Sequence, residues 1–430
     1  MKTSFDAVVI GAGPAGASAA ILLARAGWSV ALVERQRFPR RKVCGECIAA
    51  SNLPLLDALG IGPQFARLAG SELRRVALMR GGETIFAPLP AVESETHRYG
   101  RALGREHLDT LLANEAVAAG ATLLQPWSLQ AIEGEAGRFR LRVQPVGDAD
   151  GEQLLEAALV VAAHGSWEPL PSERAVLRRA RKPGDLFAFK ANFRASSIPA
   201  DLLPVLSFEG GYGGMVVADD GLATLACCIR EDRLDRDREA VPGERAGSVV
   251  EAILRRECAG VAAALEGASR EGAWLASGPI RPGVRLGAND GIFRVGNAAG
   301  EAHPIVGEGI SMALQSAFVL ASLIGPRRTA MVAPDTCAAM QSRWLRDYEN
   351  RWRQRFAQRL RVAAAFAYVA MRPWAASAAW PVAKRWPGVM TEGARWSGKT
   401  RYVAEAAQLV RLHKQLGIPA ESLIRPPKSA

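Results

Sequence analysis

The stretch Gly11-Ala-Gly-Pro-Ala-Gly16 decides the expected fold of this chain. It follows the apolar run 5–10 and precedes the alanine- and leucine-rich run 17–26, so the predicted order is strand, glycine turn and helix. Gly11 permits a tight turn, Gly13 lets the backbone approach a pyrophosphate, and Gly16 lets the helix pack closely on the strand. Amides at the start of such a helix attract phosphates. The context is therefore that of a dinucleotide-binding turn.

An acidic residue stands where such a turn needs one. Glu34 lies eighteen residues after Gly16 and directly follows a second apolar run, residues 29–33. A carboxylate at the end of the second strand accepts hydrogen bonds from a ribose diol and repels a 2′-phosphate. The first motif alone does not distinguish FAD from NAD.

A second glycine-rich stretch, residues 296–309, lies near the other end of the same predicted domain. The short strand 292–295 leads into the turn Gly296-Asn-Ala-Ala-Gly300, and Gly307-Glu-Gly-Ile310 opens another predicted helix. This stretch resembles the second FAD fingerprint of the p-hydroxybenzoate hydroxylase superfamily. In that superfamily the turn holds the ribityl chain, with Asp usual at the position of Asn297, and the helix end faces the flavin.

The resemblance implies FAD as the cofactor. Amides of Gly307, Gly309 and Ile310 would offset the negative charge of reduced flavin, by roughly 0.3–1 kcal/mol per charge. The loop Lys42-Val-Cys-Gly-Glu46 is similar to the loop beside the isoalloxazine in geranylgeranyl reductases and flavin halogenases. The helix start Arg105-Glu-His-Leu-Asp109 is similar to one whose arginine reaches the FAD phosphates. The FAD contacts that the resemblance implies are Gly11, Gly13, Pro14, Ala15, Gly16, Glu34, Arg35, Cys44, Gly45, Arg105, Leu129, Gly296, Asn297, Gly307, Gly309 and Ile310.

The fold class predicted is α/β, with a Rossmann-like FAD-binding domain, an interleaved antiparallel-sheet substrate domain and a C-terminal helical region. Residues 1–73, 98–184 and 281–330 are assigned to the FAD-binding domain, residues 74–97 and 185–280 to the substrate domain, and residues 331–430 to the helical region. Prolines 373, 381 and 387 predict several short helices in the last of these.

Composition limits the remaining possibilities. The chain has 49% hydrophobic residues, and Met1-Lys-Thr-Ser leads straight into the first predicted strand, so no signal peptide is expected. The longest apolar run, 362–371, is far shorter than the roughly 20 residues that span a bilayer. We therefore expect a cytoplasmic protein with no transmembrane segment. The six scattered cysteines do not form a disulfide framework. Cys44 and Cys47 have the spacing of a redox pair, but packing near flavin, with Cys47 in a following helix, is the favoured interpretation. The five histidines lack metal-ligand spacing, so no metal is expected.

Positive charge gathers towards the C-terminus. The net charge is +11, seven arginines lie between Arg343 and Arg361, and six of the ten tryptophans lie between Trp344 and Trp396. A solvated basic helix with aromatic packing behind it explains this pattern. An acidic protein, carrier or anionic lipid partner is the alternative. Nucleic acid is not expected, because no reader motif accompanies the charge.

The resemblance leaves several chemistries open. Flavin halogenases are disfavoured, because no lysine occurs between Lys42 and Lys182 and Val306 occupies their acidic position. Geranylgeranyl reductases, which reduce C=C bonds, carry a tryptophan at the position of Gly214. The leading hypothesis is an FAD-dependent monooxygenase that uses NAD(P)H and O2 to hydroxylate a bulky aromatic substrate. Peptidyl tryptophan and a polyketide product are examples, and a protein- or carrier-tethered substrate is included. A C=C reductase is the first alternative, and a non-catalytic FAD-bound assembly factor is another.

Candidate residues for the reaction follow from the same motifs. His303 and Glu308 flank the loop expected over the flavin, and Glu46 lies in the cysteine loop, so these three are the candidates for acid–base work. A turn-stabilising histidine and a solvated helix-start acid are equally open for the first two. Tyr212, Gly213, Gly214 and Pro304 are expected to line the substrate pocket, where the glycines leave an opening for a large substrate.

Overall fold

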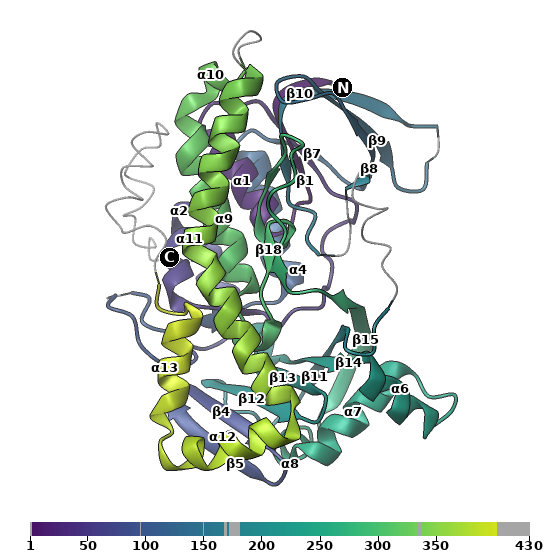
Figure 1. The fold of residues 1–430 in the computed structure, drawn as a ribbon, viewed down its shortest axis with the longest axis vertical. Helices are drawn as coiled ribbons and strands as arrows, with labels where there is room; N and C mark the ends of the chain where they lie inside the picture. Colours follow the sequence, from purple (N-terminus) through teal and green to yellow (C-terminus); the bar gives the residue numbers. More distant parts are fainter. Residues whose placement is uncertain are drawn as a thin grey trace.

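The structure is a computed structural model that describes residues 2–94, 96–148, 150–166, 170–171, 181–332 and 337–401. Two seven-stranded sheets dominate it, one in the upper half and one in the lower half of Figure 1. Residues 402–430 of the predicted helical region lie outside the described residues. The predicted α/β class is confirmed.

The first sheet grows from the opening strand–turn–helix unit. Its strand order is β7-β2-β1-β10-β9-β8, with β17 paired to β10. The central pairs β7·β2, β2·β1 and β1·β10 are parallel, which requires crossover connections such as α1 between β1 and β2. The strands are β1 (Ser4–Ile10), β2 (Val30–Val33), β7 (Thr122–Leu124), β8 (Trp127–Glu133), β9 (Phe139–Pro145), β10 (Gln153–Ala162) and β17 (Phe293–Arg294).

The second sheet has the order β15-β11-β14-β13-β12-β4-β5. All its pairs are antiparallel except β12·β4, which is parallel. Its strands are β4 (Arg75–Arg80), β5 (Glu83–Pro88), β11 (Leu186–Arg194), β12 (Leu202–Phe208), β13 (Gly211–Val217), β14 (Ala223–Arg230) and β15 (Ser269–Ile280). These strands come from the ranges assigned to the substrate domain, although the boundaries themselves stay a prediction.

Short elements join the sheets. Two small ribbons pair β3 (Cys47–Ile48) with β6 (Arg101–Ala102) and β16 (Gly283–Val284) with β18 (Gly300–Glu301). The 3-10 turns are Ala50–Asn52, Asp219–Gly221, Gly296–Ala298, Pro304–Val306 and Gly325–Arg327. The helices before the C-terminal region are α1 (Pro14–Arg25), α2 (Leu53–Ala58), α3 (Gly62–Leu68), α4 (Arg105–Ala118), α6 (Glu231–Glu239), α7 (Ala246–Glu257), α8 (Ala259–Ala264), α9 (Gly309–Ile324) and α10 (Arg328–Val332).

Helix α9 is the central helix of the upper half. It packs beside α1, and fourteen of its sixteen residues are buried. The continuous helical stretch 309–332 is long and apolar enough to cross a membrane, but 83% of its apolar 18-residue window is buried inside the protein. A core helix has the same composition, so this stretch is weak evidence for membrane insertion.

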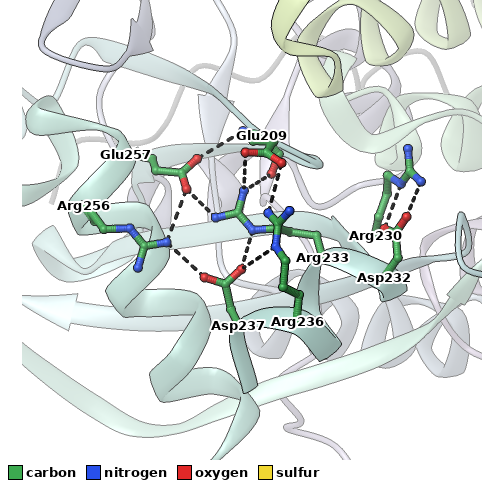
Figure 2. A network of polar contacts seen from close by, with 8 residues as sticks. All are labelled: Glu209, Arg230, Asp232, Arg233, Arg236, Asp237, Arg256 and Glu257. Atoms are coloured by element: carbon green, nitrogen blue, oxygen red, sulfur yellow. Dashed lines mark hydrogen bonds and ion pairs between the residues drawn. The ribbon is translucent and has the colours of Figure 1, made fainter. Parts of the chain in front are cut away.

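An ion-pair network fastens α6 to α7 behind the second sheet (Figure 2). Arg233 is buried at its centre and pairs with Asp237 on its own helix and with Glu257 at the end of α7. Arg256 adds a second contact to Asp237 at 3.0 Å. The network therefore satisfies a guanidinium that burial alone would make costly.

The C-terminal region differs from its prediction. One 35-residue helix, α11 (Cys337–Met371), runs almost the length of the molecule, followed by α12 (Pro373–Arg385) and α13 (Gly388–Ser397) (Figure 1). The prediction of several short helices was wrong before Pro373, because no proline interrupts residues 337–371. Pro373 is tolerated in the first turn of α12, and Pro381 lies within that helix.

Helix α11 buries one face against the first sheet's core. Residues 345, 348, 352, 356 and 360 are buried at the spacing of one helix face, and the Tyr348 hydroxyl donates to the Arg294 carbonyl at 2.8 Å. Arg343, Arg346 and Arg351 lie on the exposed side. The basic segment is thus a packed helix with a charged outer face.

Candidate active site

The first glycine turn needs glycine for steric reasons. Gly11 has φ +98°, and a Cβ there would lie 2.6 Å from the Ala163 carbonyl oxygen. A Cβ on Gly16 would lie 1.8 Å from the Gly11 carbonyl oxygen, because helix α1 packs directly on the turn. Gly13 is different, since its Cβ would meet only Arg105 Nη2, at 3.6 Å. Its open side therefore leaves room for a ligand at the start of α1.

Glu34 ends β2 next to this turn. Its buried carboxylate accepts hydrogen bonds from the Ala12 amide at 2.8 Å and the Gln36 amide at 2.9 Å. Two amide donors hold the carboxylate in one orientation, with acceptor capacity left for a ribose diol. Arg35 is exposed beside it, and Leu129 is half-buried on β8.

Three cations gather on the same side of the turn. Arg105, at the start of α4, makes two 2.7 Å hydrogen bonds to Asp109, and Arg40 Nη1 lies 3.3 Å from the same carboxylate. Burial and the charges of Arg105 and Arg40 lower the pKa of Lys42 to about 8. The positive charge is therefore in excess here, and a pyrophosphate would neutralise it.

The second turn lies against the first, although 280 residues separate them. Gly296 has φ +60°, and a Cβ there would lie 2.8 Å from the Cβ of Ala15. The Asn297 side-chain amide donates to Ser166 Oγ at 2.9 Å, while the backbone carbonyl oxygen of Asn297 accepts from Arg285 at 2.8 Å. The structure thus brings both predicted motifs into one site, with the neutral Asn297 held by neighbours.

The start of α9 carries an unforeseen charge cluster. Gly307 has φ +64° and Glu308, the residue before α9, is fully buried. Lys399, just after α13, lies 3.6 Å from the Glu308 carboxylate, and Arg359 of α11 lies 3.9 Å from it. Burial raises the pKa of Glu308, opposed by these two cations. Glu308 is therefore not a solvated helix-start acid.

Lys399 and Arg359 were missed from the sequence. They belong to the basic C-terminal segment, where no motif marks one cation among many. A Cβ on Gly307 would lie 3.5 Å from Lys399 Nζ, which puts this ammonium beside the turn that opens α9. Only the path of α11 and α13 back over the site brings these residues there.

Glu46 joins the cysteine loop to the second sheet. It has φ +58° and is buried, and its carboxylate accepts from the Lys190 ammonium, from Thr224 Oγ1 at 2.6 Å and from the Arg105 amide at 3.0 Å. Three donors fix this carboxylate, and Lys190 and Thr224 carried no sequence signal. Its surroundings favour a positioning role over acid–base work.

The cysteines of this loop differ in environment. Cys44 is half-buried in the loop, and its sulfur accepts a contact from the Glu46 amide at 3.3 Å. Cys47 is buried in strand β3, where burial raises the pKa of its thiol. The expected helix at Cys47 was wrong, because the chain pairs with β6 at this point. Both thiols are free, and this arrangement favours packing over a redox pair.

Tyr212, which lines the cavity, contacts His303. The Tyr212 hydroxyl oxygen lies 3.2 Å from His303 Nδ1. Burial lowers the pKa of His303 to about 4, and burial raises that of Tyr212 well above its usual value. The pair is therefore neutral at physiological pH and is joined by a hydrogen bond.

A cavity of about 700 Å³ is lined by residues of both glycine turns, the cysteine loop and the second sheet. It extends from Gly13 and Gly296 past Tyr212, Gly213 and Gly214 to helices α12 and α13. Its far wall is apolar, with Val76, Leu78, Leu89, Val205, Met215, Phe366, Val369, Ala376, Trp380 and Met390. The four predicted pocket residues, Tyr212, Gly213, Gly214 and Pro304, line this cavity. Its apolar wall was not predicted from the sequence.

These features fit FAD. The open face of Gly13 and the excess cations near Arg105 match the phosphates. The oriented Glu34 carboxylate matches the ribose, and the αL turn at Gly307 matches the flavin end.

The fold also gathers Glu106, His107 and Asp219, with their ligand atoms within 4.8 Å of one another, a group that the sequence spacing did not reveal. Arg41 pairs with Glu106, and the Gly104 amide donates to Asp219.

Comparison with known proteins agrees with this geometry. The sequence model of the family described as FAD binding domain matches residues 4–328. The chain is 28% identical over 367 residues to digeranylgeranylglycerophospholipid reductase 2 of Methanopyrus kandleri, covering 84% of this chain and 85% of that protein. It is 27% identical over 440 residues to menaquinone reductase of Mycolicibacterium smegmatis, covering 98% of each.

Solved structures share the fold. The myxobacterial chondrochloren halogenase superposes with a TM-score of 0.72 at 18% identity, over 98% of this chain and 99% of that one. At this identity the likeness shows the fold alone.

Proposed function

We propose that this chain reduces a carbon–carbon double bond in a long apolar, isoprenoid-like substrate. The chain belongs to the FAD binding domain family and is an FAD-dependent oxidoreductase. The observation that carries the proposal is the cavity, because its wall beyond the two glycine turns is almost wholly aliphatic and aromatic. Apolar walls accept a hydrocarbon chain by removing its surface from water.

The sequence relatives support the same substrate class. Those matching 82–98% of the chain include proteins named for reduction of a digeranylgeranylglycerophospholipid and of menaquinone. We infer that this chain acts on a substrate with a comparable hydrocarbon part. The sequence hypothesis of a monooxygenase gives way here to its first alternative.

The chain's own residues divide the work. Saturation of a double bond requires one hydride and one proton. When bound, FAD supplies the hydride. An external two-electron donor restores its electrons, and we propose NAD(P)H as that donor. Tyr212 lines the cavity and can donate the proton, and it regains a proton from water after the reaction. The neutral His303 beside it holds the hydroxyl in place by a hydrogen bond. Glu46 holds the cysteine loop in place, and the Glu308 cluster sets the charge at the start of α9.

Monooxygenation of an aromatic substrate is the second candidate. Gly213 and Gly214 leave β13 bare on the cavity wall, which gives a ring system space that a larger side chain would occupy. The acidic carrier expected for such a substrate stays a prediction. The cytoplasmic location stays a prediction too.

The two reactions separate by their need for oxygen. Purified FAD-loaded protein would be incubated with a geranylgeranylated lipid or menaquinone and a chemical reductant, without oxygen and under labelled O2. Any quinol formed by the reductant would be reoxidised before analysis. We expect substrate whose isoprenoid chain has gained two hydrogen atoms in the anaerobic sample. Product that forms only with O2 and carries its label would establish the second candidate instead.

A matched variant tests the cavity. A Cβ on Gly214 meets only the Pro204 carbonyl oxygen, at 3.1 Å, so Gly214→Trp should fit after a small adjustment and fill the space. Flavin content should stay unchanged, and turnover should fall if the substrate uses the space beside Gly214, which geranylgeranyl reductases fill with tryptophan. Full turnover by this variant would show that the substrate does not use that space.

A further inference from the structure

Exposed aromatic side chains gather at the C-terminal end of the described chain. Trp374, Trp386 and Trp396 are 67%, 59% and 60% exposed. The exposed Val382 and Val389 lie between them in sequence, and the exposed Tyr368 precedes them. The lower end of the molecule in Figure 1, formed by α12 and α13, carries this surface, which we call the tryptophan face. Burial would stabilise such side chains, so their exposure on adjacent helices indicates a partner.

Exposed and buried residues follow one another closely along both helices. Trp374, Val382 and Trp386 are exposed along α12 and its end, and Val389 and Trp396 are exposed on α13. The buried residues are small: Ala375 and Ala376 on α12, and Gly393 and Ser397 on α13. The small residues therefore pack against the rest of the protein, while the large apolar side chains stay exposed to solvent.

The same surface carries positive charge. Between Tyr368 and Ser397 there are four basic residues, Arg372, Lys384, Arg385 and Arg395, and one acidic residue, Glu392. Arg372 stacks on Tyr368 at 3.6 Å and Arg385 lies 5.8 Å from the Trp386 ring. Lys384 pairs with Glu83 and Arg395 pairs with Glu392. Exposed tryptophan and tyrosine together with arginine and lysine are typical of groups at a bilayer's polar–apolar boundary.

The tryptophan face adjoins the cavity. Ala376, Trp380 and Ala383 of α12 and Met390 and Ala394 of α13 line the cavity. Val382 and Val389 of the tryptophan face line it too, so the face and the cavity share residues. An apolar molecule dissolved in a membrane could therefore reach the cavity without crossing bulk water.

We propose that the tryptophan face docks on the surface of an anionic lipid bilayer. Trp374, Trp386 and Trp396 enter the interface between headgroups and acyl chains, while the neighbouring arginines and lysine attract anionic headgroups. Helices of 13 and 10 residues are too short to span, so they lie in the interface. Entry of substrate from the bilayer rests on the proposed function, whereas docking itself does not.

The test is co-sedimentation of the full FAD-loaded chain with vesicles. Phosphatidylcholine vesicles with and without phosphatidylglycerol would be compared, in the absence of any substrate. We expect binding that increases with the anionic lipid and decreases with salt, because screening weakens the headgroup attraction. The variant W374A/W386A/W396A should bind at least roughly tenfold more weakly, because binding scales with the apolar area inserted.

A charge control locates the binding surface. The variant K384Q/R385Q/R395Q should weaken binding to anionic vesicles, by up to roughly fivefold for each cation removed. The matched variant R343Q/R346Q/R351Q removes three exposed charges from α11 and should change binding less than twofold. Flavin content of each variant shows whether it is folded.

Three results would overturn the proposal. The first is a wild-type chain that does not sediment with anionic vesicles. The second is equal weakening by the two charge variants, which would place the contact elsewhere. The third is concentration-dependent self-association in solution that the tryptophan variant abolishes, which would make the face an interface between two copies. Loss of catalysis with intact vesicle binding would instead count against the proposed function alone.

Discussion

The nucleotide end and the apolar end of the cavity are built in opposite ways. At the nucleotide end single positions decide, because Gly11 and Gly16 admit no Cβ and one carboxylate, Glu34, faces the turn. At the apolar end the wall is shared among side chains from β4, β12, α11, α12 and α13. Backbone geometry restricts residue type severely, whereas aliphatic side chains replace one another at modest cost.

Charge follows the same division. Arg40, Lys42 and Arg105 concentrate positive charge by the first turn, and Glu308 with Lys399 and Arg359 does so by the second. The far wall of the cavity is nearly free of ionisable side chains in the part of the chain that the structure describes. Anion binding and apolar binding thus occupy one continuous space, and Glu46 with Lys190 lies where the two ends meet.

The largest effect is expected at that junction. Glu46→Gln leaves the buried Lys190 ammonium without its carboxylate, which should lower the free energy of unfolding by about 3–5 kcal/mol. The double variant E46Q/K190M removes both charges and should recover most of this loss. Urea unfolding of the two single variants and the double variant gives the coupling energy. If the losses in unfolding free energy of the two single variants are additive in the double variant, Glu46 and Lys190 do not interact, and the pair does not link the two ends of the cavity.

The same contrast explains what the sequence could predict. The strand–turn–helix at residues 11–16, Glu34 and the second turn at residues 296–309 were recognisable because each step is set by local geometry. Lys190, Thr224 and Lys399 were not, since their partners lie on elements 86 or more residues away. The apolar wall was equally hidden, because a cavity residue and a core residue have the same side chain. The sequence did not predict the single long helix α11, because the tertiary packing that selects its buried face cannot be seen in the sequence.

Two glycines of the first turn should respond differently. Gly16→Val places side-chain atoms against the Gly11 carbonyl and should cost about 3 kcal/mol of stability, the upper end for overpacking. Gly13→Val has space in the fold but occupies the side open to the pyrophosphate. It should keep nearly the wild-type free energy of unfolding as apo-protein while failing to retain FAD. Thermal unfolding and flavin absorbance separate the two effects. Full flavin occupancy in G13V would refute the placement of the phosphates.

The cation cluster predicts a pH dependence of stability. Lys42 has a folded pKa of about 8, below its ordinary value of 10.5, so between these pH values the unfolded chain binds more protons. Stability of the apo-protein should therefore rise with pH, by roughly 2 kcal/mol between pH 8 and 9.5, and the rise should be absent in Lys42→Met. Bound FAD favours the charged lysine and should reduce the rise. Identical pH profiles of wild type and Lys42→Met would contradict the cluster's excess charge.

The smallest effect is expected at the second turn, where a cation from the C-terminal helices lies near a carboxylate at the nucleotide end. Lys399 is an ammonium supplied by the C-terminal helices to the start of α9, beside Glu308. Lys399→Met leaves the Glu308 carboxylate less compensated, and this extra negative charge disfavours the anionic reduced flavin. We expect the FAD reduction potential to fall by about 20 mV, equivalent to about 1 kcal/mol for a two-electron couple. Glu308→Gln should shift it in the opposite direction, because it removes the negative charge instead.

Spectroelectrochemical titration of FAD-loaded protein measures both shifts without any substrate. Lys384→Met is the matched control, because it removes a lysine that pairs with Glu83 on the exposed surface. Its potential should equal that of the wild type. Opposite shifts for the Lys399 and Glu308 variants would show that the apolar end tunes the chemistry of the nucleotide end through charge. Shifts of the same sign would mean that both substitutions act by disturbing the packing of α9, and the electrostatic link between the two ends would be lost.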